Sequence, residues 1–348
     1  MNRQFPALRG FAILLVVINH SIVLSLQAIT QHNLPRTPLW ELNFLLTIKE
    51  MGVVAVPIFL FLAGAFMMYA MKDKKIRQNY RLVLPALKNV VFPYIIWSVV
   101  FYIFIYFLRA ETFSLPGYLK NLIVGYPFNF VPILVFYIII APLLAWIIKR
   151  VPLITLFAFL VFQLVLVNIK IPGILGFVFP DFFNLLYVPI LGLPFALWAV
   201  FYPLGMVYIQ FSQKYKSILE RFIIVIAGIS FGLYVLAVLK ELGAISFSQA
   251  EWLLPLVFIL LLPFVDRKKI PFLSFFENLG KRTYGIYLMN LTIITFLSQL
   301  AAKFIPWLFQ VETIIVMILA TLTILISSNL MKWVEHRFSR QIYNFIFG

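Results

Sequence analysis

The sequence predicts an all-α fold: a polytopic transmembrane helix bundle of about ten spans, with both termini in the cytoplasm. The 348-residue chain is 63% hydrophobic and only 11% charged, and its mean hydropathy is +1.02. Apolar runs of about 20 residues, long enough to cross a bilayer as a helix, recur along the chain. The alternating pattern of a membrane barrel does not occur. We expect one membrane-embedded domain over residues 1–348.

Ten apolar segments are the expected spans, and an even number places both termini on the same side. The eighth is short, and no small-x-small cleavage site follows the first, so we expect no cleaved signal peptide. The segments are 6–28, 51–71, 88–108, 130–148, 152–169, 184–210, 222–240, 252–265, 284–304 and 313–331.

The distribution of lysine and arginine predicts the orientation. With these spans, 21 of the 28 basic residues fall on the side of the termini, which the positive-inside rule assigns to the cytoplasm. The same rule explains the net charge of +16, so we expect no nucleic-acid partner. The longest outer segments, 29–50 and 109–129, are candidates for a substrate mouth or for interfacial anchoring.

Cysteine and histidine counts exclude several kinds of site. The chain has no cysteine, which excludes disulfides, thiolate metal sites and cysteine nucleophiles. Histidine occurs only at positions 20, 32 and 336. We therefore expect no multi-histidine metal site and no metal cofactor.

Arg9 and His20 lie near the start of the first span. They are the leading candidates for a functional site. Eleven residues are close to three helical turns, so both side chains point to one side of a helix, roughly 16 Å apart along its axis. If Arg9 lies at the membrane surface, His20 lies near the bilayer centre, where a polar side chain usually has a function. The alternative is a packing histidine bonded to a neighbouring carbonyl. A functional role for His20 is favoured because polar Asn19 is next to it and Arg9 shares its side of the helix.

Two further segments carry candidate residues. The loop from Lys72 to Arg81, with Lys88 after it, is the densest basic cluster. It is either a topological anchor that touches anionic lipid or, beside Arg9, a binding site for a phosphorylated cytoplasmic donor. Tyr287 and Asn290 are neighbours on one face of the ninth span. They form either a polar strip facing His20 or an interfacial tyrosine with a hydrogen-bonded asparagine.

Four stretches of the chain form a pattern in order along the sequence: Phe5 to His20 with its Arg-x10-His spacing, Val53 to Phe66, Leu279 to Leu288, and Trp333 to Arg337. Together they resemble the acyltransferase-3 family of integral-membrane acyltransferases. The chain's end, from Trp333 to Phe338, is expected to be an amphipathic cytoplasmic tail docked on the bundle.

The resemblance implies transfer of an acyl group, with acetyl the expected one, from cytoplasmic acyl-CoA to a hydroxyl of a cell-envelope glycan or lipid-linked sugar. His20 would be the essential histidine and Arg9 its basic partner at the donor entrance. The protein would be a multi-pass, acetyl-CoA-dependent O-acyltransferase of the bacterial inner membrane, in contact with membrane lipid. Its oligomeric state, including a homo-oligomer, stays open.

The chain departs from the family pattern at three places. Pro93-Tyr94 is present, but of the preceding basic pair only Lys88 remains, with Arg81 or Arg77 as substitutes. Asn290 stands where many relatives have histidine. Pro127-Phe128-Asn129 stands where many relatives have His-x-Trp.

The expected mechanism uses His20 as the base. Its low-dielectric surroundings favour the neutral imidazole, which is suited to take the proton of the acceptor hydroxyl. Direct transfer and an acyl-histidine intermediate both stay open. We expect Arg9, Arg77, Arg81 and Lys88 to hold acyl-CoA, and Asn290 or Tyr287 to position His20 or stabilise the oxyanion. The alternatives are export or flipping of a polysaccharide without acyl transfer, and an inactive membrane partner subunit.

Overall fold

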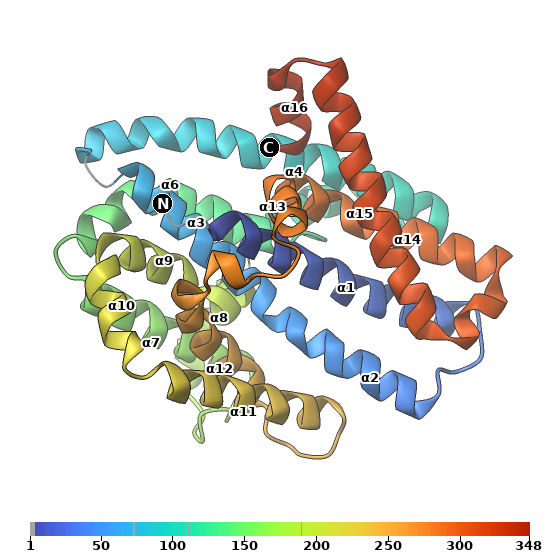
Figure 1. Ribbon diagram of the computed structural model, residues 1–348, viewed down its shortest axis with the longest axis horizontal. Coiled ribbons are helices and arrows are strands. Elements are labelled where there is room, and N and C mark those ends of the chain that lie inside the picture. Colours follow the sequence, from blue (N-terminus) through green and yellow to red (C-terminus); the bar gives the residue numbers. More distant parts are fainter. Residues whose placement is uncertain (1–3, 72–73, 110, 189) are drawn as a thin grey trace.

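Long uncharged runs fold as helices in this chain because a membrane offers backbone polar groups no partner outside their own segment. The computed structural model describes residues 4–71, 74–109, 111–188 and 190–348, and it is 83% helical with no strand in that part of the chain. The predicted all-α bundle is confirmed (Figure 1). Three residues used in the sequence predictions, Arg3, Lys72 and Asp73, lie outside the described residues.

The described chain contains α-helices and short 3₁₀ helices, labelled η. The α-helices are α1 (Phe5–Gln31), α2 (Leu39–Glu50), α3 (Ala55–Met71), α4 (Ile76–Arg109), α5 (Leu115–Val124), α6 (Phe130–Ile148), α7 (Pro152–Lys170), α8 (Gly192–Trp198), α9 (Phe201–Gln210), α10 (Ser212–Glu220), α11 (Ile223–Glu241), α12 (Gln249–Phe258), α13 (Leu273–Lys281), α14 (Thr283–Phe304), α15 (Glu312–Arg337) and α16 (Arg340–Phe347). The 3₁₀ helices are η1 (Met51–Val54), η2 (Asp181–Leu186), η3 (Ile259–Phe264), η4 (Arg267–Lys269) and η5 (Pro306–Gln310).

Eight helices of the described chain are long and apolar enough to cross a membrane, or nine if the bent pair α8 and α9 is one span. The segment Gln249–Phe264, expected as the eighth span, is a shorter apolar helix. The exact number of ten and the cytoplasmic placement of the termini stay predictions.

Several predicted boundaries differ from the observed helices. The second span was expected to start at residue 51, but α2 and η1 extend it back to Leu39. Glu41 and Glu50 suggested a loop there, yet both are buried, and Glu41 accepts a hydrogen bond from the Thr313 backbone N–H at 2.6 Å. The sixth span was expected as one helix over 184–210, but the chain bends by 46° between α8 and α9.

The end of the chain is helical and does not form an extended tail. Trp333 to Arg337 form the last turns of α15, and the amphipathic element that docks on the bundle is α16. Trp97 of α4 donates its indole N–H to the Ile346 carbonyl at 3.0 Å and stacks on Phe347. The expected segment does contact the bundle, since Val334 is buried and Glu335 accepts from Arg282, but the amphipathic element that docks is the helix after it.

Helix α1 runs through the middle of the bundle, with α13, α14 and α15 on one side and α2 and α3 on another (Figure 1). Its tightest neighbour is α13. A Cβ placed on Gly10 would overlap the Phe276 carbonyl oxygen, and one placed on Gly280 would overlap that of Pro6. The two helices therefore pack backbone against backbone, which only glycine permits. This contact fixes the start of α1 beside the segment that leads into α14.

Candidate active site

His20 and Asn290 join α1 to α14 inside the bundle. The imidazole Nδ1 lies 2.5 Å from the Asn290 amide oxygen, and Asn290 is completely buried. The amide nitrogen of Asn290 donates to the backbone carbonyl of Tyr287, one turn earlier in α14. The predicted polar strip of α14 therefore meets the predicted histidine of α1.

These two hydrogen bonds select one tautomer of His20. Because the Asn290 nitrogen already donates to a carbonyl, its oxygen must face His20, and an amide oxygen can only accept. Nδ1 therefore carries the proton, and Nε2 keeps its lone pair. The ring is held with the basic nitrogen on the edge away from Asn290.

A cavity of about 260 Å³ lies beside Arg9 at the start of α1. Its walls come from α1, α3, α4, α6 and α14 and include Arg9, Phe66, Asn89, Phe130, Tyr284 and Tyr287. His20 and Asn290 are not among the lining residues, but Tyr287 is one turn from Asn290 along α14. The cavity is therefore linked to His20 through the turn of α14 that carries Tyr287 and Asn290.

Arg9 brings a positive charge to this cavity. Its guanidinium lies 5.8 Å from the centre of the Phe66 ring, a cation–π distance. No ion pair joins Arg9 to a carboxylate of the described residues. A half-buried guanidinium without an acidic partner in that part of the chain is suited to bind an anionic group of a ligand.

The four stretches that resemble the family contact one another in the fold. Arg9 of the first contacts Phe66 of the second, and Gly10 packs against α13 of the third. Arg282 of the third donates to Glu335 of the fourth at 2.8 Å. The first three stretches each contribute residues to the walls of the cavity, and the fourth packs against the third.

The other predicted donor residues lie outside this cavity. Arg77, Arg81 and Lys88 are exposed on α4, although Asn89, next to Lys88, lines it. Tyr284 bridges to α4 by donating to the Val90 carbonyl at 2.8 Å. The structure thus brings Arg9, Tyr287, Asn290 and His20 to one side of α1 and leaves the three α4 cations at the surface.

Several lining residues could not be selected from the sequence. Phe66, Asn89, Phe130 and Thr283 belong to residue types that are common in membrane helices. The spacing of Tyr284, one turn before Tyr287, was the available signal. Only the packing of α3, α4 and α6 against α1 brings these positions together.

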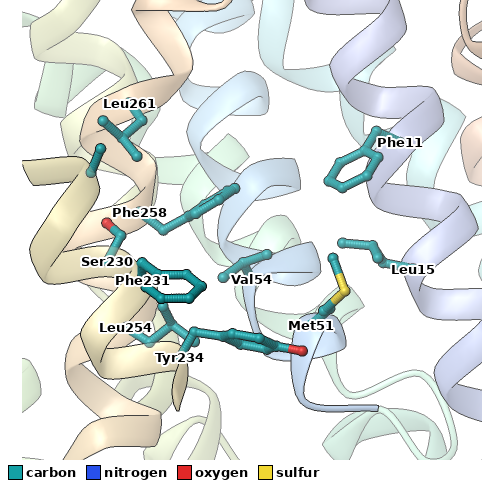
Figure 2. A pocket seen from close by; sticks show the side chains of 11 residues that line it. Phe11, Leu15, Met51, Val54, Ser230, Phe231, Tyr234, Leu254, Phe258 and Leu261 are labelled. Atoms are coloured by element: carbon teal, nitrogen blue, oxygen red, sulfur yellow. The ribbon is translucent and has the colours of Figure 1, made fainter. Parts of the chain in front are cut away.

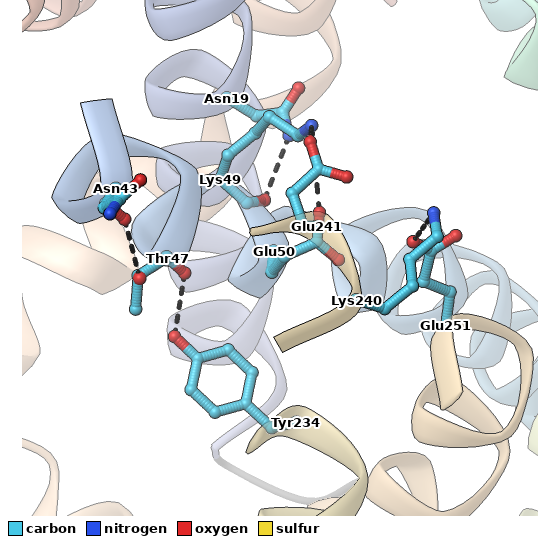
Figure 3. A network of polar contacts seen from close by, with 9 residues as sticks. All are labelled: Asn19, Asn43, Thr47, Lys49, Glu50, Tyr234, Lys240, Glu241 and Glu251. Carbon is cyan, nitrogen blue, oxygen red and sulfur yellow. Dashed lines mark hydrogen bonds and ion pairs between the residues drawn. The ribbon is translucent and has the colours of Figure 1, made fainter. Parts of the chain in front are cut away.

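A second polar cluster lies on the adjacent face of α1 and was not predicted (Figure 3). The Asn19 amide donates to the Lys49 carbonyl at 3.1 Å. Lys49 pairs with Glu241, and Lys240 with Glu251 at 2.5 Å. Carboxylate oxygens of Glu50, Glu241 and Glu251 lie within 4.8 Å of one another, close enough to share a cation. Two ammonium groups already face them, so we assign no metal to the cluster.

Comparison with protein families identifies the chain. The family model for the acyltransferase domain, Acyl_transf_3, matches residues 2–331. No curated protein and no solved structure matches the chain. The match covers essentially the whole sequence and includes Arg9, His20, Tyr287 and Asn290. The chain therefore belongs to the acyltransferase-3 family, whose members are integral membrane proteins that transfer acyl groups.

Proposed function

We propose that the protein transfers an acyl group, with acetyl the expected one, from cytoplasmic acyl-CoA to a hydroxyl of a cell-envelope glycan or lipid-linked sugar. The observation that carries the proposal is the bond between His20 Nδ1 and Asn290 Oδ1. It leaves Nε2 as a base of fixed orientation, and Tyr287, one turn from Asn290, lines a cavity that Arg9 also lines.

In the direct route, Nε2 of His20 takes the proton of the acceptor hydroxyl while the oxygen bonds to the thioester carbon. The carbon–sulfur bond then breaks, and the proton passes from Nε2 to the CoA thiolate. In the covalent route, Nε2 itself attacks the thioester carbon, the carbon–sulfur bond breaks and CoA leaves as the thiolate. The acceptor oxygen then bonds to the acyl carbon, the Nε2–carbon bond breaks, and the hydroxyl proton passes to the CoA thiolate. Both routes need the Nε2 lone pair that the Asn290 bond preserves.

The donor would enter from the side of Arg9. A volume of about 260 Å³ is below the usual range for a whole drug-sized ligand, so it suits only the acyl-pantetheine end of acyl-CoA. Arg9 would bind a phosphate at the mouth of the cavity. Arg77, Arg81 and Lys88 would then hold the nucleotide part outside it.

Asn290 and Tyr287 receive separate roles in this proposal. Both polar atoms of the Asn290 amide are engaged, one with His20 and one with the Tyr287 carbonyl. Asn290 is therefore a positioning residue. Tyr287 lines the cavity, so its hydroxyl is the better candidate to stabilise the oxyanion.

The test is release of free CoA thiol from acetyl-CoA by the purified protein in nanodiscs, with and without a crude envelope-glycan extract. We expect release to rise with extract and to fall by at least 100-fold in His20→Ala, within the range of general-base catalysis. His32→Ala is the matched control, since His32 is exposed and bonds only to Gln299 among the described residues. Turnover by His20→Ala at the wild-type rate would refute the proposal.

A further inference from the structure

An apolar groove of about 360 Å³ lies on the face of α1 that points away from the candidate active site. It is bounded by α1, η1, α11, α12 and η3. Phe231 and Tyr234 of α11 face Leu15 and Phe11 of α1 across it (Figure 2). Phe231 is 68% exposed, so the groove opens to the surroundings of the bundle, which in a membrane are lipid.

The polar cluster is close in the sequence to the residues that line this groove. Helices α1, α11 and α12 each carry groove-lining residues and, one or two turns away, residues of the cluster. Leu15 is followed by Asn19 on α1, and Tyr234 by Lys240 and Glu241 on α11. Met51 is preceded by Glu50, and Leu254 by Glu251. Tyr234 links both parts, because it lines the groove and donates to the Thr47 carbonyl at 2.8 Å (Figure 3).

An apolar groove beside a polar cluster suits an amphiphilic ligand, such as a lipid. The charges of the cluster limit which kinds of head group could bind there. Three carboxylates, of Glu50, Glu241 and Glu251, face two ammonium groups, of Lys49 and Lys240. The formal charge is therefore −1, which disfavours an anionic phosphate. Carboxylates accept hydrogen bonds from neutral hydroxyls.

Two buried polar atoms, one in the cluster and one in the groove, lack a hydrogen-bond partner in the described part of the chain. Oε2 of Glu50 accepts no hydrogen bond, although Glu50 is only 3% exposed. The hydroxyl of Ser230, 5% exposed, lines the apolar part and has none either. A buried unpaired polar atom costs about 1–3 kcal/mol. A sugar hydroxyl at Glu50 and a lipid ester carbonyl at Ser230 would satisfy them.

We propose that the groove and the cluster together bind a membrane glycolipid, with its chains between α1 and the α11–α12 pair and its uncharged sugar head group on Glu50, Glu241 and Glu251. Asn19 of the cluster directly precedes His20. The site would therefore hold a sugar hydroxyl on the face of α1 adjacent to the one that carries His20. Only the further step, that this hydroxyl accepts the acyl group, rests on the proposed function.

Binding can be tested without an acyl donor, by titrating the purified protein with defined lipids and measuring occupancy by native mass spectrometry. The probes are glucosyl-diacylglycerol, phosphatidylglycerol and phosphatidylethanolamine with identical acyl chains. We expect the glucosyl lipid to bind at least tenfold more tightly than either phospholipid. Glu50→Gln should reduce this preference, because it weakens the acceptor of the sugar hydroxyl.

Filling the groove gives the structural test. Ala227 lines the groove and is exposed to it, so Ala227→Phe adds a ring to empty space and should weaken glucosyl-lipid binding at least tenfold. Ile224→Trp is the matched control, because Ile224 is 84% exposed on α11 and does not line the groove. An unchanged melting temperature in detergent would show that both variants fold.

The outcomes separate this inference from acyl transfer. His20→Ala should bind the glucosyl lipid as the wild type does, so loss of turnover with retained binding leaves the lipid site intact. Equal affinity for the three lipids, tighter binding of phosphatidylethanolamine, or full binding by Ala227→Phe would each overturn the lipid site, whatever the result of the thiol-release assay.

Discussion

His20 and Asn290 are 270 positions apart in the chain, and their side chains bond at 2.5 Å in the middle of the bundle. Both polar atoms of the Asn290 amide are engaged, one with His20 and one with the Tyr287 carbonyl, so under the proposed function Asn290 would act on the reaction through the imidazole and not through the substrate. The proposed function thus makes Asn290 a positioning residue and His20 the base. Substitutions at the two positions should change the kinetics in different ways.

Asn290→Leu should lower kcat by roughly 10- to 100-fold and leave the KM for acyl-CoA unchanged, since only the tautomer and orientation of the base are lost. Asn290→His, which restores an acceptor at this position, should recover part of the rate. The measurement is steady-state thiol release over a range of acyl-CoA concentrations.

The control is Thr292→Val on the same helix. Thr292 is buried, and its hydroxyl has no hydrogen-bond partner among the described residues. This near-isosteric change should leave kcat within twofold of wild type. A rise in KM for Asn290→Leu, with kcat preserved, would show instead that Asn290 contacts the donor.

Arg9→Gln should raise the KM for acyl-CoA by roughly 10- to 100-fold, the equivalent of a lost charged hydrogen bond of about 1.5–3 kcal/mol. The same variant should use acetyl-pantetheine, which has no phosphate, as well as the wild type does. Initial rates with the two donors provide the comparison. A parallel loss with both donors would assign Arg9 to the structure of the cavity.

The exposed cations of α4 give a second comparison with the same assay. Arg77→Gln, Arg81→Gln and Lys88→Gln should raise the KM for acyl-CoA less than Arg9→Gln does, because these side chains lie outside the cavity. If one of them had the larger effect, the phosphates would bind along α4 and not at Arg9.

The helices and the residues of the candidate site were largely predictable, but their contacts were not. The spacing of Arg9 and His20 placed both on one side of α1, and that of Tyr287 and Asn290 placed both on one face of α14. Helical periodicity says which residues share a face, but not which helix that face meets. The bond between His20 and Asn290 depends on the close approach of α1 to α13 and α14.

The start of α2 was missed for a different physical reason. Charged residues in a hydrophobic chain suggest a loop, because an isolated charge in a bilayer is costly. Glu41 instead caps the backbone at the start of α15, and Lys49 pairs with Glu241 of α11. Pairing removes much of that cost. The partner of Lys49 is about 190 residues away in the sequence, and that of Glu41 is about 270 residues away.

Glu277 and Arg267 predict a pH-dependent contribution to stability outside the spans. The Arg267 guanidinium donates to Glu277 at 2.7 Å and holds the pKa of that carboxyl below its ordinary value. A lowered pKa in the folded state stabilises the protein above the unfolded pKa, and this contribution disappears as pH falls through the folded pKa.

Glu277→Gln should therefore lower the melting temperature slightly at pH 7, and the difference from wild type should vanish below about pH 4. The effect is small because both side chains are partly accessible to solvent, which screens the pair. Melting curves of both proteins in detergent between pH 3.5 and 7 provide the measurement. A difference that grows as the solution becomes more acidic would contradict the assignment.

The contact between α1 and α13 gives a prediction about stability that is independent of catalysis. Gly280→Ala places a methyl group against the Pro6 carbonyl oxygen, which is backbone and cannot rotate away. Separating the helices should cost about 1–3 kcal/mol, as for other overpacked contacts, and should lower the melting temperature by several degrees.

Gly228→Ala is the matched control, because nothing lies within 4 Å of a Cβ at that position of α11. It should be neutral or stabilising, since alanine is the better helix former. Because α13 holds the start of α1, Gly280→Ala should also displace Arg9 and raise the KM for acyl-CoA, whereas Gly228→Ala should not. Equal melting temperatures for the two variants would mean that α13 does not anchor α1.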